Sequence, residues 1–198
     1  MIKRFMPLLL VAIILFSTTA NAAIYEYFPD VPLDADYAYA VNHLAELGIF
    51  SGDEKGNFNP NKTLTRAEFA VTMVRLIGET DKALKSKTSS FSDVPKNHWA
   101  CGYIEVAVEY GLFSGYGNGK FGPGDTLTYE QAVAILLRVL RYEKEAQEAG
   151  GWPLGYIKIG RELNLLVNTS INNSKPINRK TVSILLYNAI MRVEPNMN

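Results

Sequence analysis

Two arginines occupy equivalent places at the start of expected helices, where they could bind an anion. Arg66 follows Thr65 and Arg179 follows Asn178, and both preceding residues are favoured helix N-caps. The amides and the dipole of a helix N-terminus attract negative charge, and a guanidinium can bind a carboxylate through two hydrogen bonds. We therefore predict that Arg66 and Arg179 recognise a carboxylate. The alternative is that each arginine only completes a salt bridge at its helix start.

The residues around Arg66 form a capping box, Thr65-Arg66-Ala67-Glu68. In such a box the threonine hydroxyl accepts from the glutamate amide, and the glutamate carboxylate accepts from the threonine amide. These bonds use the amides at the two ends of the box. We therefore expect the amides of Arg66 and Ala67 to be free for an anionic ligand.

Two tryptophans and two glycines could complete a binding site around the arginines. Trp99 and Trp152 offer flat aromatic faces against which a sugar ring could pack, although packing between helices explains them equally well. Gly52 and Gly115 would let the backbone approach a ligand closely, because glycine has no side chain. The candidate ligand-binding residues are Arg66, Arg179, Trp99, Trp152, Gly52 and Gly115.

Other chemistries find little support in the sequence. The single cysteine and the two histidines have no clustered partners, so we predict no metal site and no cofactor. The glycine pattern at 117–122 lacks the preceding buried strand of a dinucleotide site. The formal net charge is zero over 198 residues, which argues against nucleic-acid binding. No catalytic residue is predicted, and we expect a protein that is not an enzyme.

The N-terminal residues are typical of a secretory signal peptide. Lys3 and Arg4 precede an apolar stretch at 5–16 that is too short for a comfortable membrane span, and Ala20-Asn21-Ala22 fits a cleavage site. We predict a signal peptide over 1–22, with an uncleaved anchor as the alternative. The mature chain is then secreted, and we expect no membrane span after cleavage.

The rest of the chain is built from internal repeats. Several residues of the first unit recur in one register in the second; these pairs are Phe28 and Phe91, Asp30 and Asp93, Gly48 and Gly111, Gly52 and Gly115, Phe58 and Phe121, Thr65 and Thr128, and Arg75 and Arg138. A third, more divergent copy repeats the tryptophan as Trp152 and the helix start as Asn178-Arg179. The predicted units are 24–78, 88–142 and 150–194.

Each unit has the pattern of a helix, a loop and a second helix. Apolar residues recur at helical spacing, and no segment alternates as a strand does. Gly48, Gly111 and Asn164 are expected to end the first helices, since glycine and asparagine tolerate the left-handed conformation there. We predict an all-α fold in which three helix-loop-helix repeats pack around a pseudo-threefold axis lined by the second helices. Residues 79–90 and 143–151 are expected to be connectors.

These motifs resemble three tandem S-layer homology (SLH) motifs. The resemblance rests on the Phe-x-Asp-Val openings at 28–31 and 91–94, the Gly-(Ile/Leu)-x-x-Gly turns at 48–52 and 111–115, and the Thr-Arg-Ala-Glu signature at 65–68. It implies noncovalent attachment to a bacterial cell wall through a secondary wall polysaccharide that often carries pyruvate ketals. It also implies ligand grooves between the motifs.

The chain departs from the SLH pattern in two places that matter for binding. Tyr129 replaces the arginine in the second unit, and Asp36 stands where the first unit would carry its tryptophan. An arginine-dependent groove is therefore not expected at the second unit. The leading interpretation is a wall-anchoring protein at the surface of a bacterium. The alternatives are an envelope component that assembles with other SLH proteins and, less favoured, a wall hydrolase.

Overall fold

The computed structural model describes residues 28–86, 88–170 and 174–192, so the predicted signal peptide lies outside the described residues. The described part of the chain is helical, as predicted, with no strand beyond isolated bridges. Its helices are α1 (Ala38–Glu46), α2 (Arg66–Leu76), α3 (Thr80–Lys85), α4 (Cys101–Glu109), α5 (Tyr129–Val139), α6 (Glu143–Glu148), α7 (Leu154–Glu162) and α8 (Arg179–Arg192).

The local signals for helix starts and stops are confirmed. Thr65 and Thr128 each take part in a complete capping box, and the Asn178 side chain accepts from the Thr181 amide at 3.0 Å. The residues that follow the first helices all have positive φ: Gly48 at 69°, Gly111 at 70° and Asn164 at 55°. The expected connectors differ from the prediction, because each contains a short helix, α3 or α6. Both helices consist mostly of residues that favour helix, such as alanine, lysine and glutamate.

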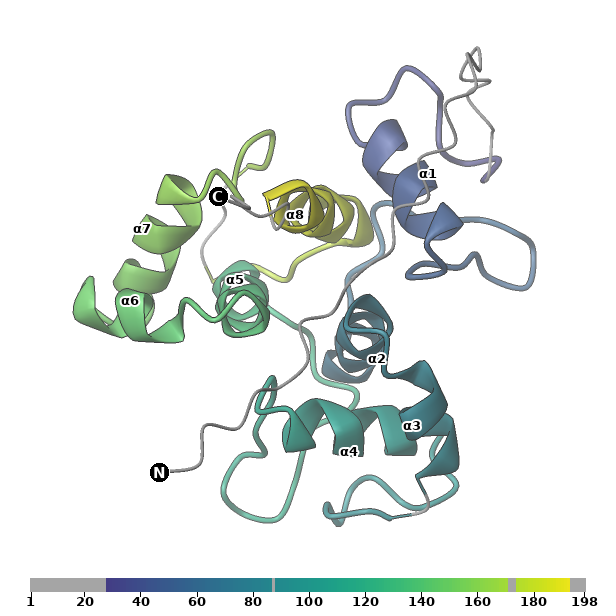
Figure 1. Cartoon of the computed structure of the whole chain (residues 1–198). Helices are drawn as coiled ribbons and strands as arrows, with labels where there is room; N and C mark the ends of the chain where they lie inside the picture. The colour runs from purple at the N-terminus through teal and green to yellow at the C-terminus, as the bar shows by residue number, and fades with distance from the viewer. Residues whose placement is uncertain (1–27, 87, 171–173, 193–198) are drawn as a thin grey trace.

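The helices form three lobes around a centre occupied by the second helices. Figure 1 shows α2, α5 and α8 end-on in the middle, with α1, α4 and α7 further out. The first helix of each unit packs on the second helix of another unit: α4 on α2, α7 on α5 and α1 on α8. The pairing of α1 with α8 brings the two ends of the described chain together and closes the ring.

A cycle of backbone hydrogen bonds joins the three units at the centre. The Leu64 amide donates to the Ile177 carbonyl (3.1 Å), Ile177 to Leu127 (2.8 Å), and Leu127 back to Leu64 (3.1 Å). The three side chains are buried in one continuous hydrophobic core. Each of these residues lies just before a central helix, so the cycle gathers the N-termini of α2, α5 and α8 at one junction.

The short helices α3 and α6 lie directly on glycines of the outer helices. A Cβ at Gly102 would lie 2.0 Å from the Ala83 carbonyl oxygen of α3, and a Cβ at Gly155 would lie 2.0 Å from the Ala146 carbonyl oxygen of α6. Only a residue without a side chain permits this contact. In the lobe formed by α1 and α8, the corresponding residue is Tyr39.

Candidate carbohydrate-binding site

The Arg66 side chain leaves the start of α2 and enters the loop of the next unit. Thr65 has an extended backbone (φ −84°, ψ 163°), so Arg66 is the first helical residue. Its Nε donates to the Phe121 carbonyl at 3.0 Å, and its Nη2 donates to the Ser114 carbonyl at 2.9 Å. The arginine of the first unit is thus held by the turn and the loop of the second.

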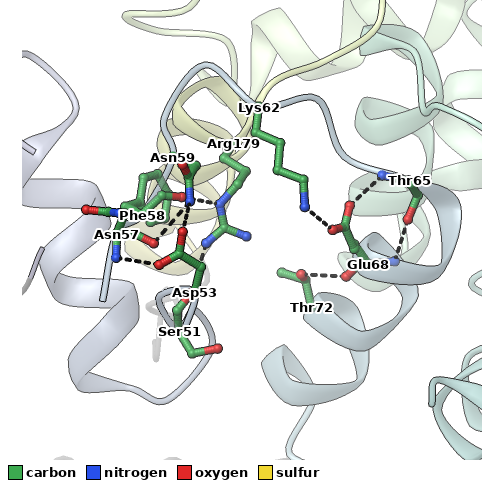
Figure 2. A network of polar contacts seen from close by, with 10 residues as sticks. All are labelled: Ser51, Asp53, Asn57, Phe58, Asn59, Lys62, Thr65, Glu68, Thr72 and Arg179. Carbon is green, nitrogen blue, oxygen red and sulfur yellow. Dashed lines mark hydrogen bonds and ion pairs between the residues drawn. The ribbon is translucent and has the colours of Figure 1, made fainter. Parts of the chain in front are cut away.

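Arg179 makes the same contacts one step around the ring. Its Nε donates to the Phe58 carbonyl at 2.6 Å and its Nη2 to the Ser51 carbonyl at 2.9 Å (Figure 2). Both acceptors belong to the first unit, whereas Arg179 starts the last helix of the described chain. The two arginines that the sequence analysis aligned therefore occupy equivalent environments at two different junctions between units.

Aromatic rings surround both guanidinium groups. The Arg66 Cζ lies 4.6 Å from the ring centre of Phe121 and 4.9 Å from that of Tyr116, and the Arg179 Cζ lies 4.4 Å from that of Phe58. These distances are within the range of cation–π attraction. Burial lowers the pKa of both arginines, but a guanidinium keeps its charge at neutral pH.

Two aspartates hold the loops that receive the arginines. Asp30 accepts from the amides of Phe58 (2.6 Å) and Asn59 (2.7 Å), and Asp93 accepts from those of Phe121 and Gly122, both at 2.8 Å. Burial alone would raise the pKa of Asp93, but these two amide bonds bring the pKa below its usual value. Each Phe-x-Asp-Val aspartate thus positions the carbonyl to which an arginine from a neighbouring unit donates.

The prediction of free amides at the start of α2 is wrong. The Arg66 amide donates to the Asp125 carbonyl at 2.8 Å, and the Ala67 amide donates to the Pro123 carbonyl at 3.1 Å. At α8 the amides of Arg179 and Lys180 are likewise used, by carbonyls of residues 62 and 60. The sequence could not reveal this, because the acceptors lie in another unit. Any anion must therefore be bound by the side chains.

Neither arginine completes the salt bridge that was the alternative interpretation. Within the described residues, no carboxylate oxygen lies within 4.0 Å of the Arg66 or Arg179 guanidinium, although Arg138 pairs with Glu143 at 2.9 Å. Arg66 is only 7% exposed. Its guanidinium lies against carbonyl oxygens and ring faces, and the carboxylates of Asp125 and Asp93 act on its charge from further away.

A small cavity of about 90 Å³ lies beside Arg66. It brings together Arg66 and Trp152, both predicted site residues, with residues that the sequence analysis did not assign: Phe113, Ser114, Gln131 and Arg138. Its lining includes two guanidinium groups and an indole that is 55% exposed, and it includes no carboxylate. We call it the Arg66 groove, and its composition suits a small anion attached to a sugar.

The other predicted site residues lie near the arginines or at matching positions. Trp99, the counterpart of Trp152, is 62% exposed. Gly52 and Gly115 directly follow Ser51 and Ser114, the carbonyls that accept from the arginines. A Cβ at Gly115 would lie 2.5 Å from the Phe91 ring, so packing within the turn already requires this glycine. A role for either glycine in ligand approach stays a prediction.

Arg75 and Arg138 are structural arginines whose role the sequence analysis did not identify. The Nη1 of Arg138 donates to the Leu112 carbonyl at 3.1 Å, and that of Arg75 donates to the Ile49 carbonyl at 3.3 Å. Each therefore holds the turn that also receives an arginine from another unit. The sequence signal for this role was that both units have an arginine at this matching position.

At the third junction the helix start carries a tyrosine instead of an arginine. Tyr129 takes the place of Arg66, and its hydroxyl lies 2.8 Å from the Thr169 hydroxyl; burial raises the pKa of Tyr129. A cavity of about 290 Å³ lies there, lined by Tyr129, Asp36, Lys180 and Thr181 among others. Tyr129 starts the helix that faces the loop of the third unit, and this unit also lacks the Phe-x-Asp-Val opening.

None of the described helices combines the length and the apolar character needed to cross a membrane. In the same part of the chain, no group of three or more His, Cys, Asp or Glu side chains is arranged to hold a metal ion. Cys101 is buried, and its thiol contacts the Thr88 carbonyl at 3.0 Å.

The S-layer homology domain family matches two parts of the chain, residues 27–70 and 90–133. The chain is 38% identical over 165 residues to a "Cell surface protein" of Thermoanaerobacter kivui, covering 82% of this chain and 21% of that protein. It is 35% identical over 142 residues to a "Surface layer protein" of Brevibacillus choshinensis, covering 71% of this chain and 12% of that protein. An "Endoglucanase" of a Bacillus species is 29% identical over 102 residues, covering 52% of this chain and 10% of the enzyme. The chain thus spans about a fifth or less of the length of these relatives.

Proposed function

Since the chain contains two S-layer homology domains, at 27–70 and 90–133, we propose that it attaches noncovalently to the bacterial cell wall by binding an anionic secondary wall polysaccharide. The domains and the cell-surface relatives indicate a secreted bacterial surface protein. We also propose that 150–194 is a divergent third repeat, because α7 and α8 complete the ring of helix pairs. The protein would act by binding and not as an enzyme.

One observation carries this proposal: the Arg66 guanidinium is buried without a carboxylate partner among the described residues. The Nε and Nη2 atoms of Arg66 donate to carbonyl oxygens, and its Nη1 atom takes part in neither of these two bonds. Arg138 lines the same cavity, but its charge is paired with Glu143, so Arg66 is the cation that remains for a ligand. A ligand carboxylate would give Arg66 the direct ionic contact that Asp125 and Asp93, which act on it from further away, do not make.

The size of the groove favours an anion that projects from a sugar. The cavity has a volume of about 90 Å³, in which a carboxylate and a methyl group would fit. A pyruvate ketal has these two groups on one carbon, fixed to the ring. The sugar itself would then lie outside, against the exposed Trp152.

The experiment is sedimentation of the secreted chain with purified walls before and after chemical removal of the secondary polymer. We expect the chain to sediment with intact walls and to stay in solution with stripped peptidoglycan. Calorimetry with polymer fragments, before and after mild acid hydrolysis of the ketals, tests the finer point. Equal affinity for both fragments would contradict recognition of pyruvate. Equal sedimentation with stripped walls would favour assembly with other wall components over polymer binding.

A further inference from the structure

The lobe formed by α1 and α8 differs from the other two in what covers its outer helix. In the other lobes, α3 packs on α4 and α6 packs on α7, with their backbones against Gly102 and Gly155. Among the described helices, α1 packs only against α8. Its residue at the glycine position is Tyr39, which is 69% exposed. Among the described residues, a large and exposed aromatic side chain thus stands where the other lobes have a glycine under a short helix.

Three rings from the two helices of this lobe form an ordered cluster. The rings of Tyr39 and His43, one turn apart on α1, are nearly parallel, with an interplanar angle of 8° and centres 6.2 Å apart. Tyr187 of α8 meets both rings at 86°, with centres at 5.3 and 5.6 Å. Tyr187 therefore holds the other two rings from one side. We call this cluster the aromatic platform.

The residues at matching positions in the other lobes are not aromatic. Val74 and Leu137 correspond to Tyr187, and both are fully buried. Val106 corresponds to His43 and is also buried. The hydrophobic core of a lobe is thus satisfied by aliphatic residues under a short helix. Replacing all of them by rings that remain partly accessible indicates a surface with its own binding role.

The shape of the platform argues against a helix as its partner. A helix placed as α3 is placed on α4 would bring a carbonyl oxygen to 2.0 Å from a Cβ at this position, and Tyr39 has both a Cβ and a ring there. A flat ligand avoids this conflict. The C–H face of a pyranose is the flat, weakly polar surface that packs well on parallel aromatic rings.

The platform continues from the cavity at the third junction. Asp36, which lies two residues before α1, and Ile184 of α8 both line that cavity of about 290 Å³. Ile184 and Tyr187 are three residues apart on α8 and therefore lie on one face of that helix. The cavity also offers Lys180 and Thr181, which can form hydrogen bonds to sugar hydroxyls. Cavity and platform therefore adjoin along α8.

We propose that the Tyr39–His43–Tyr187 platform is a stacking subsite for an uncharged pyranose residue of a polysaccharide that continues into the adjoining cavity. The inference rests on the proposed binding of a wall polysaccharide but concerns different residues and a different part of the ligand. The arginine junctions would bind charged sugars, and this lobe would bind neutral ones. A longer polymer segment could then contact more than one face of the protein.

The test is calorimetry of the full secreted chain with wall polysaccharide fragments whose ketals have been removed by mild acid. We expect Tyr39→Ala to weaken binding by about tenfold and Tyr39→Phe to retain it, because stacking depends on the ring. The matched control is Tyr110→Ala, which removes a tyrosine at the C-cap of α4, outside the platform and the cavities. Circular dichroism and thermal melts check that each variant is folded.

Three outcomes would overturn the inference. Undiminished binding by Tyr39→Ala, or no binding of these fragments by the parent, would remove the subsite. A parent that sediments as a dimer in the ultracentrifuge, with a monomeric Tyr39→Ala, would assign the platform to a second copy of the chain. Failure of intact, pyruvylated polymer to bind would instead contradict the proposed function, so the two failures are distinguishable.

Discussion

The guanidinium of Arg179 donates a 2.9 Å hydrogen bond to the carbonyl of Ser51, a residue 128 positions earlier in the chain. Arg66 makes the equivalent bond to Ser114, 48 positions later. Each of these two arginines therefore donates to a carbonyl of a unit other than its own. Each arginine junction is assembled from at least two units, so a single unit could not provide the site.

Replacing Arg66 tests whether it recognises ligand charge. We expect Arg66→Ala to cost about 1.5–3 kcal/mol in binding of pyruvylated fragments, the usual value of a hydrogen bond to a charged group. Arg66→Lys should recover part of the affinity, since lysine keeps the charge and loses the planar fork. Calorimetry with both kinds of fragment is the measurement. Arg66 also holds the loop at Phe121, so thermal melts of each variant must accompany the calorimetry. Tyr129→Phe is the control at the junction whose helix start carries a tyrosine.

The two arginine junctions are predicted to differ in strength because of one residue. Gln131 lines the Arg66 groove, whereas its counterpart at the Arg179 junction is Glu68, which pairs with Lys62 at 2.7 Å (Figure 2). Burial lowers the pKa of Arg179, and the negative charge of Glu68 is the largest of the effects that raise it. We expect Glu68→Gln to strengthen carboxylate binding at Arg179 by several-fold.

The reciprocal variant, Gln131→Glu, should weaken binding at Arg66. Both substitutions should preserve the capping boxes, since each residue already performs that role in one unit. Calorimetry of the pair, resolved into two classes of site, is the measurement. Unchanged affinity in both variants would show that the charge at this position does not reach the ligand.

Acid should destabilise the fold through the loop aspartate Asp93. Its pKa is lowered in the folded state, so the unfolded chain binds more protons as the pH falls. The stability that this group contributes is fully present above its unfolded pKa, near 3.9, and is lost as the pH falls through the lower folded value. We expect Asp93→Asn to be less stable at neutral pH and to show a flatter decline below pH 4. Urea unfolding between pH 2 and 7 measures both, with Asp81→Asn on the short helix α3 as the control.

Alanine at the two helix-contact glycines should destabilise the protein. Gly102→Ala or Gly155→Ala would force α3 or α6 away from its outer helix, because the added Cβ would lie 2.0 Å from a carbonyl oxygen. Overpacking of this kind costs about 1–3 kcal/mol, which outweighs the intrinsic gain of about 1 kcal/mol for alanine in a helix. Urea unfolding measures the effect. Gly124→Ala, where a Cβ meets nothing within 4 Å, is the control, and equal stability of all three variants would contradict the packing argument.

The sequence by itself determined the elements that depend on neighbours along the chain. The capping box of Thr65 and Glu68 and the turn at Gly48 involve residues at most a few positions apart, so their chemistry can be read locally. The repeated motifs also identified Arg66 and Arg179 as equivalent residues.

Only the tertiary structure decided what those arginines contact. The partners of Arg66 and Arg179 lie 48 to 128 positions away, and the backbone carbonyls that accept from them carry no sequence signature. For the same reason the amides of Arg66 and Ala67 were expected to be free and are occupied. The exposure of Tyr39 likewise depends on the absence of a covering helix among the described residues, a relation between lobes. Local preferences select the helices, whereas the ring closure of α1 on α8 selects which surfaces remain open to a ligand.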